Sequence, residues 1–343
     1  MSPRFASLSL STAAYALALA LPLAPAHAQS TGCPGKNLLI EMKATDATAH
    51  TRILTAAAAA KNGKTLLWKI EHEDAPDRPA SYLFGTLNVS DERLQSFSTA
   101  VTEALDVSSR IALEVDETSL ERTQEALTVM RDALLPASAS GKLETLLAKP
   151  EAARANLLLA RSGLPKDLAA RVKPWVAMLL TSTSDCERQR LRQGKLPLDA
   201  EMAKQAENRG VGSFGLESTE MQFSAFALLS DTQQMSLFKA SLAAADHIDD
   251  RTEALIQLYL AHDIGAMWPL HVELGKHYGA DAEALEAFRQ NVIEDRNIRM
   301  RDRTMMHLAT GGVFIAVGAM HLPGDTGLVE LFKDAGFKLT ALE

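Results

Sequence analysis

The chain of 343 residues contains only two cysteines, few aromatic residues (5%) and no surplus of positive charge. With no Cys-x-x-Cys pair and no histidine beside either cysteine, a cysteine metal site is excluded. Lys and Arg number 35 against 43 Asp and Glu, and the formal net charge of −8 excludes the basic footprint of a nucleic-acid binder. Because 47% of the residues are hydrophobic and no long like-charge run occurs, the composition also excludes a disordered chain.

Several familiar catalytic signatures are also missing. The sequence has no Gly-x-Ser-x-Gly elbow, no phosphate-cradling glycine loop and no His-Glu-x-x-His pair. No repeat of fixed period and no low-complexity linker divides the chain. These absences exclude the commonest serine hydrolases, P-loop proteins and zinc peptidases, so any chemistry must come from a less familiar arrangement.

The amino terminus has the pattern of a targeting segment. Arg4 opens a short positive region, an apolar run follows from residue 6 to residue 21, and Ala26-His27-Ala28 offers a cleavage site. We therefore expect residues 1–28 to be a signal peptide and the protein to be exported, either to the periplasm or to the medium. The apolar run is shorter than the roughly 20 residues that a spanning helix needs, so we expect no stable membrane span. Residues 30–33 resemble a lipoprotein box only weakly, because the required apolar residue is missing.

Export bears on the two cysteines, Cys33 and Cys186. In an oxidising compartment such a pair forms a disulfide by default, which would tie the start of the mature chain to a distant segment. The alternative is two separate thiols, one of them buried. In either case we expect both cysteines to be structural.

The hydrophobic pattern predicts strands near both ends of the chain and helices in the middle. We expect one α+β domain over residues 65–343, preceded by an N-terminal extension, residues 29–64. Its central mixed sheet would be built from N- and C-terminal segments, with a largely helical middle packed over it. Asp199 and Asp281 are the expected caps of two helices, the second of them long and ending near Leu308. The predicted strands cover residues 65–70, 81–84, 110–115, 211–216, 313–317 and 337–342.

Two segments share one pattern, in which a strand ends at a glycine and a polar residue follows three positions later. They are Gly85 followed by Asn88, and Gly318 followed by His321. A glycine allows a sharp turn, so the polar side chain is expected to project over the carboxyl edge of the sheet, and both glycines are structural. Glu114 ends another strand. A carboxylate and an imidazole at one sheet edge predict a metal site or an acid–base site, although either residue alone is more typical of a structural role.

This combination resembles the TraB/GumN family, whose animal relatives include the Tiki proteins. The family shows two Gly-x-x-His motifs and an intervening glutamate after a strand. Here GAMH at 318–321, followed by LPGDTG, matches the second motif, and Glu114 matches the glutamate. The similarity runs from about Leu67 to Leu342 and includes Glu217 in GLES, Gln222, and Arg296 with Asn297. It implies a metal-dependent protease in which the two histidines and the glutamate hold the ion.

The first motif departs from the family, because Asn88 stands where the family has histidine. The resemblance implies His321, Glu114 and Asn88 as ligands of Mn, Co or Zn, and an amide oxygen is a weaker donor than imidazole. The weakened site would favour manganese or a calcium-like ion. Asn88 could instead hydrogen-bond a substrate without any metal, or serve the turn alone.

Arg296 provides an independent indication. It lies between Val292 and Met300 on an apolar helix stripe, so its guanidinium must find an anion or several carbonyls. Glu114, Glu217 and a substrate carboxylate are the candidate partners. A buried structural ion pair is an equally good interpretation. We expect Glu114, His321 and Arg296 to be catalytic, and Asn88, Asn297 and Glu217 to contact the substrate.

Three functions remain. The first is a metal-dependent hydrolase that acts on a peptide or protein, with Glu114 as ligand or general base and Arg296 stabilising negative charge. The second is a catalytically inactive envelope binding protein of the same fold, which the substitution at Asn88 favours. The third is a haem- or iron-binding protein.

Overall fold

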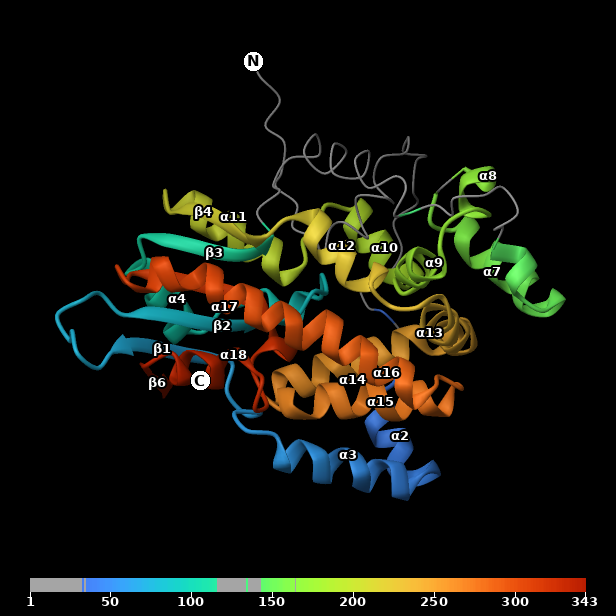
Figure 1. Cartoon of the computed structure of the whole chain (residues 1–343), viewed down its shortest axis with the longest axis horizontal. Helices are drawn as coiled ribbons and strands as arrows, with labels where there is room; N and C mark the ends of the chain where they lie inside the picture. Colours follow the sequence, from blue (N-terminus) through green and yellow to red (C-terminus); the bar gives the residue numbers. More distant parts are fainter. Residues whose placement is uncertain (1–32, 34, 116–133, 135–142, 164) are drawn as a thin grey trace, which may run out of the picture.

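The computed structural model describes residues 33, 35–115, 134, 143–163 and 165–343, and these contain a six-stranded mixed sheet (Figure 1). The order of the strands is β4-β3-β5-β2-β1-β6. The pairs β2–β5, β5–β3 and β3–β4 are parallel, whereas β1 pairs antiparallel with β2 and β6. The predicted α+β class, with strands from both ends in one sheet, is confirmed. The strands are β1 (Leu67–His72), β2 (Ser81–Thr86), β3 (Arg110–Val115), β4 (Gly212–Glu217), β5 (Val313–Gly318) and β6 (Phe337–Ala341).

The central strand β5 explains how the two glycine motifs come together. It lies between β3 and β2, and its apolar run is buried because the sheet is covered on both faces. Thr86 at the end of β2 pairs with Gly318, and Leu113 of β3 pairs with Ala316. The carboxyl ends of β2, β3 and β5 therefore meet at one edge of the sheet.

Helices make up most of the chain between β3 and β5. In Figure 1 the strands lie on the left, α13 to α16 lie on the right, and α17 crosses in front of the strands. The helices are α2 (Leu38–Thr45), α3 (Ala47–Ala59), α4 (Thr99–Asp106), α7 (Lys149–Ala160), α8 (Lys166–Ala169), α9 (Pro174–Thr181), α10 (Asp185–Arg192), α11 (Leu198–Asn208), α12 (Thr219–Ala227), α13 (Asp231–Ala244), α14 (Ile248–Leu260), α15 (Met267–His277), α16 (Ala282–Phe288), α17 (Asp295–Leu308) and α18 (Leu328–Asp334).

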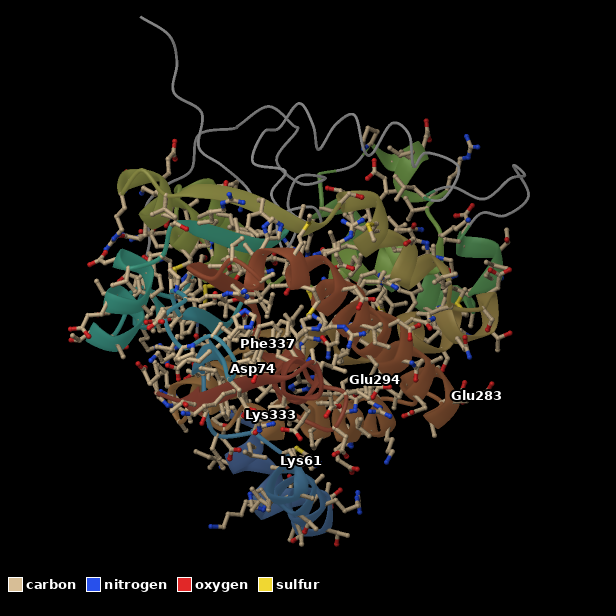
Figure 2. The ribbon with its side chains drawn as sticks, turned by 60° about the vertical axis from the view of Figure 1, so that its left-hand side comes forward. Lys61, Asp74, Glu283, Glu294, Lys333 and Phe337 are labelled. Carbon is tan, nitrogen blue, oxygen red and sulfur yellow. A yellow bond between two sulfur atoms is a disulfide. The ribbon has the colours of Figure 1, made fainter. Side chains whose placement is uncertain are left out.

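The long helix expected after Asp281 is not a uniform α-helix. Asp281 is its N-cap as predicted, but a π-helical turn, Arg289–Glu294, separates α16 from α17. The wider turn aligns side chains five residues apart, and Gln290 donates a hydrogen bond to Asp295 at 2.7 Å. Figure 2 places Glu283 at the outer end of this helix and Glu294 nearer the middle of the molecule.

The predicted cap at Asp199 is wrong by two positions. Pro197 is the N-cap of α11, and Asp199 lies within its first turn. Proline is favoured where a helix begins because a backbone N–H at that position would have no partner within the helix. An acidic side chain in the first turn is stabilised by the positive end of the helix dipole.

The segment before α2 is joined covalently to the helical middle. Cys33 and Cys186 form a disulfide with their Cα atoms 5.7 Å apart, which connects this segment to α10. A disulfide is consistent with an extracytoplasmic location. The expected signal peptide, residues 1–28, and residues 119–133 of the predicted helical middle lie outside the described residues. In the part of the chain that is described, no helix is both long and apolar enough to cross a membrane.

Candidate functional site

Glu114 is the carboxylate at the carboxyl end of β3, and three groups donate hydrogen bonds to it. Its Oε1 accepts the Gly318 N–H at 2.6 Å, and its Oε2 accepts Gln222 Nε2 at 3.0 Å and Arg296 Nη2 at 2.6 Å. Burial alone would raise the pKa of Glu114, but Arg296, His321 and the Gly318 N–H outweigh it and lower that pKa to about 2. The carboxylate is therefore ionised at neutral pH, and its side chain remains 20% exposed.

Arg296 of α17 bridges two carboxylates. Its Nε donates to Glu217 Oε2 at 2.7 Å, while its Nη2 donates to Glu114, and the side chain is only 7% exposed. Burial would lower the pKa of Arg296, but the two carboxylates raise it further above its usual value. Glu217 is fully buried, and burial raises its pKa even though the charge of Arg296 acts in the opposite direction. Arg299 Nε lies 3.5 Å from Glu217 Oε1. The partners of Arg296 that the sequence left open are thus Glu114 and Glu217.

His321 is held in one orientation by Asn297. Its Nδ1 lies 2.7 Å from Asn297 Oδ1, and the amide nitrogen of Asn297 donates to the Thr326 carbonyl at 2.8 Å. Because that second bond orients the amide, we assign the imidazole proton to Nδ1, which leaves the lone pair on Nε2. Nε2 lies 3.4 Å from Arg296 Nη1 and 3.8 Å from Glu114 Oε1. Burial lowers the pKa of His321 to about 4, with Arg296 adding to the shift and Glu114 opposing it. The ring is therefore neutral at neutral pH.

Both motif glycines lie where a side chain would be in tight contact with its neighbours. A Cβ on Gly318 would lie 3.1 Å from Glu114 Oε1, and a Cβ on Gly85 would lie 3.1 Å from the Cα of Ala319. The hydroxyl of Tyr259 also donates to the Gly85 carbonyl at 2.7 Å. Close approach of the chain, rather than an unusual backbone angle, accounts for glycine at these two positions.

Asn88 lies two residues beyond β2, at the same sheet edge. Its Oδ1 is buried and has no hydrogen-bond partner among the described residues, and the same holds for Thr86 Oγ1. The structure thus brings Glu114, Arg296, Glu217, Asn297 and His321 into one hydrogen-bonded network and leaves the Asn88 carbonyl outside it. An unpaired buried oxygen is costly unless a ligand or water satisfies it.

Some of the side chains at this edge are suited to act as ligands of a metal ion. Among the described residues, no three His, Cys, Asp or Glu side chains are grouped so that they could hold an ion. The neutral Nε2 of His321 and the unpaired Asn88 Oδ1 suit coordination, and Glu114 is ionised, as a ligand must be. Both oxygens of Glu114 already accept hydrogen bonds, one of them from the guanidinium of Arg296.

Sequence reasoning missed two members of this edge. Thr326 orients Asn297 through its carbonyl, and its hydroxyl donates to Glu294 at 2.8 Å. Thr86 carries the second unpaired oxygen. Both lie within the motif segments, at positions 86 and 326, but a threonine gives no chemical signal of its own in a sequence.

Comparison with known proteins settles the family. Residues 66–341 match the TraB/PrgY/gumN family. The chain belongs to the TraB/PrgY/gumN family. It is also 25% identical, over 263 residues, to a protein of Treponema pallidum (strain Nichols) that is named only as an uncharacterized protein. That similarity covers 74% of this chain and 76% of the Treponema protein.

The region matched to the TraB/PrgY/gumN family includes every strand of the described sheet, from β1 to β6. It contains both glycine motifs, Glu114, and the α17 residues Arg296 and Asn297. The disulfide-linked segment with α2 and α3 lies before it. The network at the sheet edge is therefore built entirely from the family region.

Proposed function

We propose that this protein is a divalent-metal-dependent hydrolase that cleaves peptide bonds. One observation carries the proposal: His321 is neutral and held by Asn297, and its Nε2 lies 3.8 Å from Glu114 Oε1 and 3.4 Å from Arg296 Nη1. His321, Glu114 and Asn88 Oδ1 would hold Mn²⁺, Co²⁺ or Zn²⁺. When bound, such an ion supplies Lewis acidity toward a peptide carbonyl.

The surrounding residues have separate roles in this proposal. Glu114 is either a ligand of the ion or the group that accepts a proton during hydrolysis, and its ionised, partly exposed carboxylate suits both roles. Arg296 lies beside it and stabilises negative charge that develops on the substrate. Glu217 and Asn297 hold Arg296 and His321 in place, and their contact with the substrate stays a prediction. Asn88 is the group that would meet either the ion or the substrate.

The test is metal uptake and cleavage of unfolded casein by the purified protein with Mn²⁺, Co²⁺ or Zn²⁺ at micromolar concentration. We expect one bound ion per chain and measurable cleavage. His321→Ala should abolish both, whereas His277→Ala removes an exposed histidine and should change neither. If the protein takes up no metal and cleaves nothing under these conditions, the proposal is wrong.

A second candidate is a binding protein of the same fold that has lost catalysis. It is favoured by Arg296, whose guanidinium already neutralises Glu114 at 2.6 Å, the position where an ion would otherwise supply positive charge. Asn88→His separates the two candidates. A gain of metal affinity in that variant, with neither uptake nor cleavage in the unaltered protein, would support loss of catalysis. The third candidate, haem binding, is checked by an absorbance scan after haem addition.

We also propose that the protein acts outside the cytoplasm, in the periplasm or the medium. The pattern of residues 1–28 and the disulfide between Cys33 and Cys186 support this proposal. Mass spectrometry of the protein isolated from the cell envelope and from the medium should find a chain that begins at Gln29. A chain that retains residues 1–28 and accumulates in the cytoplasm would contradict it.

A further inference from the structure

A cavity of about 310 Å³ lies in the helical part of the molecule, apart from the sheet edge. Its walls come from α2, α9 and α12 to α16, of which α13 to α16 lie beside one another on the right in Figure 1. None of Glu114, Arg296 and His321 is among its described lining residues. The volume is within the usual range for a small-molecule site.

Aromatic side chains form much of the cavity wall. The rings of Trp268 and Phe288 stack with their centroids 6.1 Å apart, and Phe226 meets Phe288 edge-on at 5.8 Å. Met178 and Leu237 complete this apolar wall. Such a lining binds the apolar body of a ligand by excluding water from both surfaces.

The described residues that line the cavity include an arginine and two histidines but no carboxylate. Arg251 lines it and donates to the Ser182 carbonyl at 3.2 Å, while no aspartate or glutamate is found among the described lining residues. His271 lies within reach of the charge of Arg251, and its Nδ1 faces the Met267 carbonyl at 2.8 Å. That contact assigns the proton to Nδ1 and leaves Nε2 as an acceptor. The wall therefore offers a ligand the cation of Arg251 and the neutral acceptor Nε2 of His271, besides the hydroxyl groups that line it.

We infer that this cavity binds a monocarboxylate with an apolar body, whose carboxylate meets Arg251 and whose apolar part lies against Trp268, Phe226 and Phe288. Arginine is the side chain best suited to a carboxylate, because its planar fork donates two parallel hydrogen bonds. A neutral ligand of the same shape would make no charge-assisted contact with Arg251. The site is independent of the proposed hydrolase site, so either one can fail without the other.

Isothermal titration calorimetry with decanoate, and with decan-1-ol as the neutral counterpart, tests the inference on the purified protein. We expect saturable decanoate binding and affinity for decan-1-ol that is weaker by about tenfold, the loss of one charge-assisted interaction. Equal affinity for the two probes, or no binding of decanoate, would overturn it.

Two neighbouring alanines of α13 provide a matched pair of variants that does not depend on Arg251. Ala244 lines the cavity, and Ala243 is exposed and does not. Ala244→Phe should fill the space and weaken decanoate binding at least about tenfold, whereas Ala243→Phe should leave it within about twofold of the unaltered protein. Equal binding by the two variants would show that decanoate binds elsewhere.

Arg251→Gln tests the charge directly. It should weaken decanoate binding by about tenfold and leave decan-1-ol unchanged, with Arg251→Lys intermediate. Arg192→Gln removes an exposed charge from α10 and should have no effect on either probe. If Arg251→Gln folds with an unchanged melting temperature and still binds decanoate normally, the assignment of Arg251 is wrong.

Discussion

At the scale of single residues, the candidate site is a network of polar groups that orient one another. Thr326 fixes Asn297, Asn297 fixes His321, and Arg296 joins Glu114 to Glu217. The orientation of each side chain, and the protonation state of those that titrate, thus depend on neighbouring groups. Changes at this edge should act through that chain of contacts.

Gly318→Ala should disturb Glu114 without straining the backbone. The new Cβ would lie 3.1 Å from Glu114 Oε1, so the carboxylate must shift away from the Gly318 N–H. We expect a loss of about 1–3 kcal/mol in the free energy of unfolding, as is typical of overpacking. Gly212→Ala is the control, because nothing lies within 4 Å of its Cβ. Urea unfolding of the two variants measures the difference, and equal midpoints would contradict the prediction.

The pH dependence of stability should include a contribution from His271. Burial and the Arg251 charge lower the pKa of His271 to about 4, against the opposing hydrogen bond to Met267. In the unfolded chain this imidazole takes up its proton near pH 6.5, so the unfolded state binds more protons between the two values. Stability is therefore lost as the pH falls from about 6.5 to about 4.

His271→Gln should reduce that loss, since it removes the titrating group. Urea unfolding at about pH 7 and about pH 5 should give a smaller difference for this variant than for the unaltered protein. His277→Gln, at an exposed position of the same helix, should keep the original difference. A full-sized loss in His271→Gln would show that other groups cause it.

At the scale of secondary-structure elements, the sheet edge depends on contacts between elements that are distant in sequence. β5 supplies the Gly318 turn between β2 and β3, and α17 brings Arg296 and Asn297 to the same edge. The π-helical turn before α17 shifts the helical register relative to α16, which a uniform helix would not do. α14 reaches the end of β2 through Tyr259.

Tyr259→Phe should loosen that connection between α14 and β2. The Tyr259 hydroxyl donates to the Gly85 carbonyl at 2.7 Å and is buried, so its removal leaves the carbonyl one partner short. We expect the free energy of unfolding to fall by about 1–2 kcal/mol. Tyr278→Phe is the control, because no hydrogen bond of the Tyr278 hydroxyl is found in the described part of the chain. Thermal unfolding of the two variants measures the difference. If Tyr259→Phe has the melting temperature of the unaltered protein, the hydrogen bond between α14 and β2 does not contribute to stability.

At the scale of the whole molecule, two features are separated in space and in chemistry. The charged network lies at the carboxyl edge of the parallel strands, and the aromatic cavity lies among the helices α2, α9 and α12 to α16. The disulfide between Cys33 and Cys186 holds the segment before α2 against α10. This covalent connection closes a loop of 153 residues that includes β1, β2 and β3.

Replacing both cysteines by serine should destabilise the protein by about 4 kcal/mol, because a long closed loop limits the entropy of the unfolded chain. Urea unfolding measures the change. Dithiothreitol should destabilise the unaltered protein by a similar amount and leave the double variant unaffected. If the reductant has no effect on the unaltered protein, the disulfide makes no contribution to its stability.

The sequence alone was sufficient to predict the strands and the family. The run at Arg110–Val115 is predicted with the bounds that the structure shows, and β5 is predicted from an unbroken apolar run. These predictions succeed because strand pattern, glycine placement and turn residues are local properties. The same local signals placed Glu114 and His321 at the ends of strands that prove to be neighbours.

Tertiary structure alone decided what those side chains do. Arg296 could have met Glu114, Glu217 or a substrate, and it meets both carboxylates across separations of 182 and 79 residues. The tautomer of His321, the unpaired oxygen of Asn88 and the aromatic cavity likewise depend on groups that are distant along the chain. Hydrogen bonding, burial and charge act between neighbours in space, so a sequence pattern can name the participants but cannot determine their partners.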